Sequence, residues 1–133
     1  MSGPARICVI DDEVAVLDAT ALGLREAGYD VLTAPGAAAG LDLIARGGFD
    51  AIVTDMNMPG TSGAQLIVEA RARWADMPIV AISGSIDAAG ESMLDTALAL
   101  GADALLPKPF RAAEIKRVIE GVLRLRRRAS HAL

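Results

Sequence analysis

Short apolar runs recur along the chain at near-regular intervals, with amphipathic segments of helical length between them. Five runs are β-branched or aliphatic and too short for helices; they are Ile7–Ile10, Val31–Thr33, Ala51–Thr54, Ile79–Ile82 and Ala104–Leu106. Their apolar character is continuous rather than alternating, which is typical of strands buried on both faces of a parallel sheet. The pattern therefore predicts five parallel β-strands.

The segments between and after these runs carry apolar residues at helical spacing, which gives each segment one apolar face. The stripes are Val14, Leu17, Ala21 and Leu24; Leu41, Ile44 and Ala45; Leu66, Ile67 and Ala70; Met93, Leu94, Ala97 and Leu98; and Ile115, Ile119, Val122 and Leu125. Gly28, Gly47, Gly48 and Gly101 follow such segments, where glycine favours a left-handed helix stop. Five helices are expected.

Strand and helix alternate five times, which predicts an α/β fold with right-handed crossovers and helices on both faces of the sheet. The fold expected is a doubly wound, five-stranded parallel sheet of the flavodoxin-like order 2-1-3-4-5. Spacing alone does not fix that order. In this topology a crevice opens at the carboxyl ends of the strands, where ligands bind.

Composition narrows the class of protein. The 133 residues suggest one domain, and a net charge of −4 argues against a basic surface for nucleic acid. The single cysteine, Cys8, excludes an internal disulfide, and the single histidine, His131, argues against histidine-dependent catalysis. Because no run of about 20 apolar residues exists and no signal stretch follows Met1, we expect a cytoplasmic protein.

Charged and polar residues follow four of the predicted strands. They are Asp11, Asp12 and Glu13; Asp55; Ser83 and Gly84; and Pro107, Lys108 and Pro109. Two carboxylates about 4 Å apart repel by roughly 4 kcal/mol at an effective dielectric near 20, so a shared pocket needs protons or a cation. A hard divalent ion such as Mg²⁺ suits carboxylate ligands and leaves room for a phosphate oxygen.

This constellation favours phosphoryl chemistry. Asp55 would attack phosphorus and become an acyl phosphate. Lys108 would neutralise a phosphoryl oxygen, and Ser83 would donate a hydrogen bond to another.

Four motifs together resemble bacterial response-regulator receiver domains of the single-domain, chemotaxis-regulator type over about residues 5–123. The motifs are Ile-Asp-Asp-Glu at 10–13, Asp-Met-Asn-Met-Pro-Gly at 55–60 with Gly63, Ser-Gly at 83–84 and Leu-Pro-Lys-Pro-Phe at 106–110. The resemblance implies phosphorelay signal transduction in a two-component system. The chain would not be an enzyme beyond its own phosphorylation and dephosphorylation.

The resemblance also assigns roles to residues. Asp55 would be the phosphoacceptor, with Mg²⁺ (or Mn²⁺) held by Asp12 and Asp55, by Asp11 mostly through water, and by the backbone carbonyl of Asn57. Ser83 and Lys108 would bind the phosphoryl group. Loop roles fall to Pro59, Gly63, Gly84 and Pro109, and the Lys108–Pro109 peptide bond is often cis in such domains.

The same resemblance implies partners. The phosphodonor would be a sensor histidine kinase or a histidine phosphotransfer protein, and output would act in trans on another protein. The expected output surface is the face of the fourth helix, fifth strand and fifth helix. Residues 124–133 would form a basic C-terminal tail, without specific nucleic-acid recognition and without membrane insertion.

One departure from the family pattern leaves an alternative open. Receiver domains often carry an aromatic residue three positions before the lysine, whereas this chain has Leu105. The alternative is a receiver-fold binding module whose output does not depend on phosphate. A third interpretation, an aspartate-nucleophile phosphatase, fits poorly because Asp55 follows the third strand and no cap insertion exists.

Overall fold

The sheet has five parallel strands in the order β2-β1-β3-β4-β5, as the sequence predicts. The computed structural model describes residues 3–58, 63–84 and 93–131. The strands are β1 (Arg6–Ile10), β2 (Asp30–Ala34), β3 (Ala51–Asp55), β4 (Ile79–Ser83) and β5 (Ala104–Pro107). Each contains the apolar run that predicted it and is one or two residues longer.

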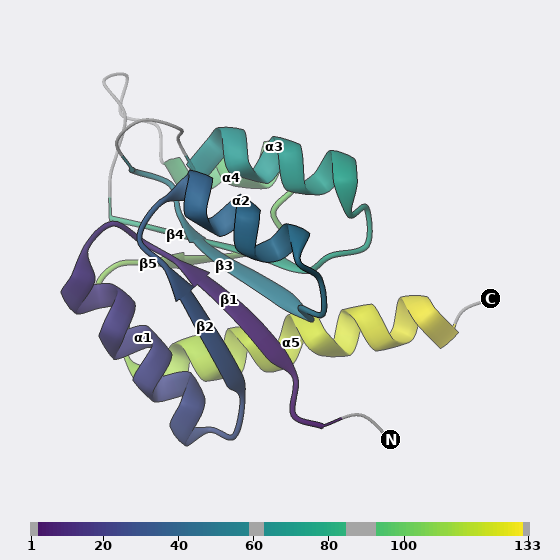
Figure 1. Cartoon of the computed structure of the whole chain (residues 1–133), viewed down its shortest axis with the longest axis horizontal. Coiled ribbons are helices and arrows are strands. Elements are labelled where there is room, and N and C mark those ends of the chain that lie inside the picture. Colours follow the sequence, from purple (N-terminus) through teal and green to yellow (C-terminus); the bar gives the residue numbers. More distant parts are fainter. Residues whose placement is uncertain (1–2, 59–62, 85–92, 132–133) are drawn as a thin grey trace.

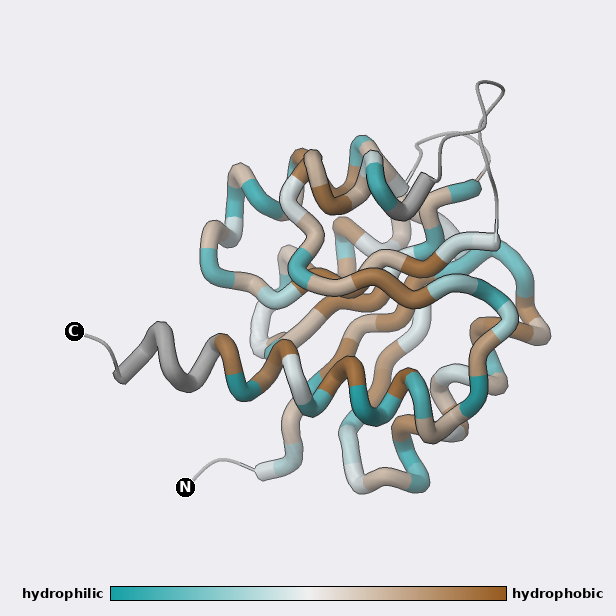
Figure 2. Tube along the Cα trace, turned by 180° about the vertical axis from the view of Figure 1, so that it is seen from behind, coloured by the Kyte–Doolittle hydropathy of each residue, from teal (hydrophilic) through white to brown (hydrophobic). Residues whose placement is uncertain are grey.

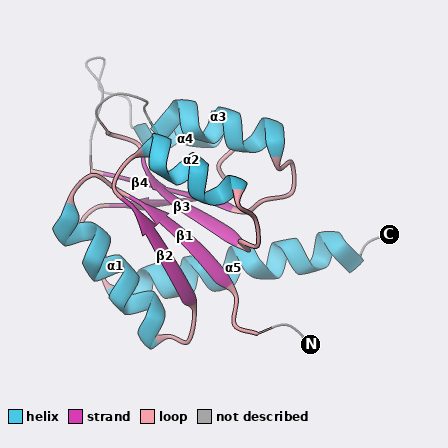
Figure 3. Cartoon of the chain, in the orientation of Figure 1, coloured by secondary structure: helices cyan, strands magenta, loops and turns pink. Residues whose placement is uncertain are grey.

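Helices cover both faces of the sheet (Figures 1 and 3). They are α1 (Val14–Glu26), α2 (Ala37–Ala45), α3 (Gly63–Arg73), α4 (Met93–Leu100) and α5 (Ala112–His131). Helices α1 and α5 pack on one face, and α2, α3 and α4 pack on the other. This division gives the molecule two apolar layers with the sheet between them, which confirms the doubly wound fold.

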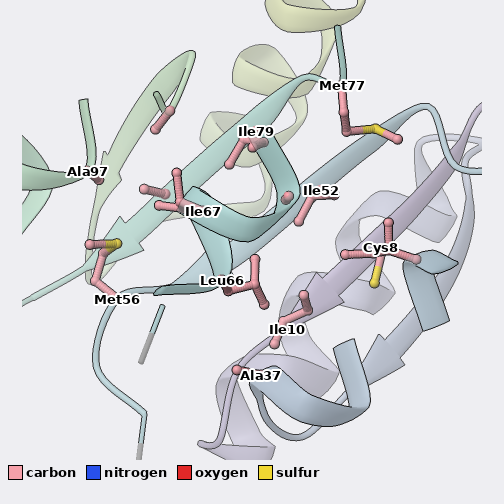
Figure 4. Close-up of a cluster of buried hydrophobic side chains, with 14 of the residues drawn as sticks. Cys8, Ile10, Ala37, Ile52, Met56, Leu66, Ile67, Met77, Ile79 and Ala97 are labelled. Carbon is pink, nitrogen blue, oxygen red and sulfur yellow. The ribbon is translucent and has the colours of Figure 1, made fainter. Parts of the chain in front are cut away.

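Successive residues of a strand point their side chains into opposite apolar layers. Ile7 and Val9 belong to the cluster beneath α1 and α5, whereas Cys8 and Ile10 belong to the cluster beneath α2, α3 and α4. Figure 4 shows the second cluster, and Figure 2 shows the hydrophobic strands at the centre of the trace. Burial raises the pKa of the Cys8 thiol to about 12, so Cys8 behaves as a small apolar residue.

Among the described side chains, four of the predicted stripe residues are exposed, including Ala45 at the end of α2, because the apolar faces are narrower and shorter than the spacing suggested. Val14 is the first residue of α1, and Leu98 follows the buried Ala97 of α4. Leu125 lies in the C-terminal half of α5, a helix whose end extends beyond the sheet (Figure 1). The side chains of Met93 and Leu94 lie outside the described residues.

Three helices are followed by glycines in the left-handed conformation, as the sequence predicts. The four glycines after α1, α2 and α4 have positive φ angles: 99° at Gly28, 85° at Gly47 and Gly48, and 119° at Gly101. Helix α5 continues to His131, so the expected boundary between residues 123 and 124 falls within one helix. In the part of the chain that the structure describes, no helix is long and apolar enough to cross a membrane.

Arg71, near the end of α3, connects three segments of backbone at the amino-terminal edge of β4. Its guanidinium donates to the carbonyls of Ala75 (2.7 Å), Met77 (2.8 Å) and Gly101 (2.7 Å), and to Asp103 Oδ2 (2.8 Å). The same carboxylate accepts the backbone N–H of Ile79 at 2.8 Å. One side chain thus satisfies carbonyls in the loop before β4 and in the loop before β5.

We expect Arg71→Ala to lower the free energy of unfolding by about 2–4 kcal/mol, because it leaves several carbonyls and one carboxylate without their donor. Urea denaturation measures the change. Arg73→Ala is the matched control, since the exposed Arg73 guanidinium stacks on Trp74 at 4.7 Å, a contact worth about 0.5–1 kcal/mol. Equal losses in the two variants would contradict the role given to Arg71.

Candidate functional site

The site lies where the carboxyl ends of four parallel strands meet. Residue pairing aligns Ile10 with Thr54, Asp55 with Ile82, and Ser83 with Pro107. The residues that follow β1 and β5 therefore lie beside the last residues of β3 and β4. Parallel pairing thus gathers chemistry from positions almost 100 residues apart.

Asp55 is the last residue of β3, and its side chain is only 3% exposed. Its Oδ1 accepts the backbone N–H of Asn57 at 3.2 Å, and its Oδ2 lies 3.3 Å from Lys108 Nζ. Burial, together with the neighbouring charge of Asp11, raises the pKa of Asp55 to about 6, although the Asn57 N–H and Lys108 oppose that rise. The ionised form of Asp55 is thus disfavoured by burial and stabilised by the Asn57 N–H and by Lys108.

Lys108 supplies a cation to this pocket, and its side chain is 14% exposed. Its Nζ lies 3.1 Å from Asp11 Oδ2, 2.9 Å from Glu13 Oε1 and 3.3 Å from Asp55 Oδ2. Burial lowers the pKa of Lys108, but the contacts with Glu13 and Asp11 and the charge of Asp55 outweigh that effect, so the net pKa is raised. The ammonium group is therefore firmly protonated.

Three carboxylates form a group that could hold a cation. One oxygen each from Asp11, Asp12 and Asp55 lie within 4.8 Å of one another. Asp11 is buried and its Oδ1 accepts the backbone N–H of Glu13 at 2.9 Å, while Asp12 is exposed. Although Asp11 Oδ2 forms the ion pair with Lys108, it accepts no hydrogen bond from the described residues.

The other residues that the sequence assigned to the site differ in burial and contacts. Ser83 is buried, and its carbonyl accepts the backbone N–H of Lys108 at 3.1 Å. Gly84 is exposed, and the Lys108–Pro109 bond is cis. The side chain of Leu105 is half-buried against the layer of α2, α3 and α4. Pro59 lies outside the described residues.

Gly63 contributes through close packing of backbone. A Cβ at this position would clash with the Asp55 carbonyl oxygen and would lie 2.7 Å from Met56 Cα. The structure therefore gives a reason for glycine at this position: there is no room for a side chain beside the end of β3. The first residue of α3 thereby presses directly on the end of β3.

Sequence reasoning missed two features beside the predicted residues. Glu13 was noted only as part of an acidic run, yet its carboxylate makes the shortest of the three carboxylate contacts to Lys108. A cavity of about 550 Å³ also opens between α1 and the start of α5, with Glu13, Lys108, Phe110 and Ile115 among its lining residues. The third acid of the run and Phe110 after the lysine were the available signals.

Known proteins share this sequence and fold. The sequence profile of the response regulator receiver domain matches residues 7–120. Response regulator MprA of Mycobacterium sp. (strain KMS) is 36% identical over 121 residues, covering 91% of this chain and 51% of MprA. Transcriptional regulatory protein FixJ of Bradyrhizobium diazoefficiens is 32% identical over 124 residues, covering 93% and 59%. The chain spans only part of the length of these relatives.

Solved structures agree with the sequence matches. A CheY-like receiver domain protein from Methanospirillum hungatei JF-1 superposes with a TM-score of 0.87 at 27% identity, covering 96% of this chain and 99% of that one. NtrX from Brucella abortus gives a TM-score of 0.89 at 27% identity, covering 97% of this chain and 29% of NtrX. The chain belongs to the response regulator receiver domain family of two-component phosphorelay signalling.

Proposed function

We propose that this receiver domain is a Mg²⁺-dependent switch that accepts a phosphoryl group on Asp55 from a phosphohistidine. The observation that carries the proposal is the placement of one buried carboxylate, Asp55, beside both a lysine ammonium at 3.3 Å and two further carboxylates. A cation and a phosphoryl group can be held together only where such groups converge. The proposed phosphodonor is a sensor histidine kinase or a histidine phosphotransfer protein in the cytoplasm.

The residues present fit a hard divalent cation. All the available side-chain ligands are oxygens, which suits Mg²⁺ or Mn²⁺, and the buried Oδ2 of Asp11 lacks a hydrogen-bond donor among the described residues. Asp11, Asp12, Asp55 and the backbone carbonyl of Asn57 are the proposed holders. When bound, the ion would offset the repulsion of the carboxylates and stabilise charge on phosphoryl oxygens.

The chain's own groups account for the transfer. A carboxylate oxygen of Asp55 forms a bond to phosphorus as the P–N bond of the phosphohistidine breaks, and the electron pair of that bond returns to the imidazole nitrogen. Lys108 pairs with a phosphoryl oxygen, and the Ser83 hydroxyl donates to another. We do not propose that this site turns over small-molecule substrates, because the acyl phosphate remains on the chain until water hydrolyses it.

The cavity beside the site offers a place for the phosphodonor. It lies between α1 and the start of α5, and Lys108 and Glu13 form part of its wall. A side chain of the donor that enters this cavity would bring its phosphohistidine toward Asp55. The downstream partner is proposed for the α4, β5 and α5 face, where Leu105 packs beneath α4 and could transmit a change through its packing.

Phosphorylation by acetyl phosphate tests the proposal. Intact mass should rise by one phosphoryl group with Mg²⁺ present and stay unchanged when EDTA removes the ion. Borohydride reduction, which marks the carbon of an acyl phosphate, should then mark residue 55 in peptide mass spectra. An unmodified protein across several small donors, or a mark elsewhere, would reject the proposal.

Mg²⁺ should also stabilise the folded protein. At a free concentration 100 times the dissociation constant, binding to the native state alone adds about 2.7 kcal/mol, and a thermal melt at constant ionic strength measures the change. Asp12→Asn should lose most of this gain, because it removes a proposed ligand from an exposed position. Asp18→Asn is the control: an exposed carboxylate of α1 outside the group, whose loss should leave the Mg²⁺ effect intact.

A further inference from the structure

Glu13 is a solvent-exposed residue that contacts Lys108 of the proposed phosphoryl site. Its Oε1 accepts a hydrogen bond from Lys108 Nζ at 2.9 Å, and its backbone N–H donates to Asp11 Oδ1 at 2.9 Å. The carboxylate itself is 61% exposed, whereas the side chains of Asp11 and Asp55 are 0% and 3% exposed. Of the three described carboxylates that contact Lys108, Glu13 is therefore the one that water can reach freely.

Three carboxylates already surround the Lys108 ammonium before a phosphoryl group arrives. An ammonium group carries three N–H donors, and three carboxylate oxygens already lie within 3.3 Å of it. A phosphoryl oxygen on Asp55 would therefore compete with these carboxylates for the ammonium. Freeing Glu13 is the easiest exchange, because an exposed carboxylate regains water, whereas freeing Asp11 would leave a buried charge unpaired.

We propose that Glu13 is a positioning residue that holds Lys108 in the resting protein and competes with the phosphoryl group for it. This inference rests on the proposed function of Asp55. Glu13 weakens binding of a phosphoryl group by the free energy of an exposed ion pair, and the pair must open before Lys108 turns. Removing the pair should tighten binding of a phosphoryl mimic about threefold to fivefold, the size typical of such pairs.

Charge alone could give part of the same effect, since Glu13 also repels an anion. Two variants separate the causes. Glu13→Gln removes the charge and weakens the hydrogen bond, whereas Glu13→Asp keeps the charge on a side chain one methylene shorter, which retracts it from Lys108. If competition for Lys108 dominates, Glu13→Asp should keep most of the gain seen in Glu13→Gln.

The experiment is calorimetric titration of beryllofluoride into the full chain with saturating Mg²⁺. Glu13→Gln and Glu13→Asp should both bind more tightly than wild type, while Glu26→Gln, which changes an exposed carboxylate at the other end of α1, should match wild type. Wild-type affinity in Glu13→Gln, or in Glu13→Asp alone, would overturn the positioning role. Absence of any binding by the wild type would instead reject the proposed function itself.

A second measurement reports on Lys108 directly. The chain has two lysines, Lys108 and Lys116, so isotope-labelled lysine gives one signal from the site and one reference signal from α5. In the free protein, Glu13→Gln and Glu13→Asp should shift the Lys108 side-chain resonance and leave Lys116 unchanged. An unshifted Lys108 resonance in both variants would show that the pair with Glu13 does not hold the ammonium, and would overturn the inference.

Discussion

Asp55→Asn is expected to take up no phosphoryl group from acetyl phosphate under conditions that phosphorylate the wild type fully. The amide cannot form a stable acyl phosphate, and among the described residues no other carboxylate combines burial with contact to Lys108 at the end of β3. Asp11 is buried too, but it follows β1, where its Oδ1 is held by the Glu13 N–H. Intact mass measured over time gives the answer.

The same substitution should stabilise the metal-free protein at neutral pH. Folding raises the pKa of Asp55 from an ordinary 3.8 to about 6, so the folded chain binds this proton more tightly than the unfolded chain. Wild-type stability therefore falls as the pH rises through that interval, by about 3 kcal/mol in total. Asn carries no such charge, and urea denaturation at pH 4 and pH 7.5 without Mg²⁺ should show the flatter dependence.

Asp18→Asn provides the control for both readouts, since this exposed carboxylate of α1 lies outside the pocket. It should be phosphorylated as the wild type is and keep the wild-type pH dependence. Phosphorylation of the Asp55→Asn protein would place the acceptor elsewhere. An unchanged pH slope in that variant would show that burial of Asp55 costs less than its environment implies.

Regular features of the fold could be predicted because they repeat. Buried parallel strands have a local signature, a short continuous apolar run, and all five runs form strands. Their carboxyl ends share one edge of the sheet, so Asp11, Asp55 and Lys108 could be placed together without knowing any side-chain conformation. The Leu98 and Leu125 errors arose because helical spacing defines a stripe but not how far the sheet beneath it extends.

Features that depend on one pair of distant atoms could not be predicted. Glu13 and Lys108 are 95 positions apart, and nothing in either local sequence favours Glu13 over Asp12 as the partner of the lysine. The contacts of Arg71 are equally specific, because they depend on where the loops before β4 and β5 leave their carbonyls. Motif spacing identifies which residues meet, while the orientation of each side chain decides which of them pair.

Among the glycines that the structure describes, Gly63→Ala should produce the largest loss of stability. The new methyl group would overlap the Asp55 carbonyl and crowd Met56 Cα, and both are backbone atoms that cannot rotate away. Overpacking of this kind costs about 1–3 kcal/mol and sometimes more, and we expect the upper end. Urea denaturation measures the loss, and a low-temperature titration with Mg²⁺ and beryllofluoride should also show weaker binding, because relief of the overlap moves Asp55.

Gly121→Ala is the matched control, since a Cβ at that position in α5 meets nothing within 4 Å. Alanine is favoured over glycine inside a helix by about 0.5–1 kcal/mol, so this variant should gain stability while Gly63→Ala loses it. Opposite signs for one chemical change would locate the cause in the space around Gly63 rather than in helix propensity. A gain in both would mean that α3 moves off β3 at little cost, and Asp55 would then owe its position to Lys108 and Asn57 alone.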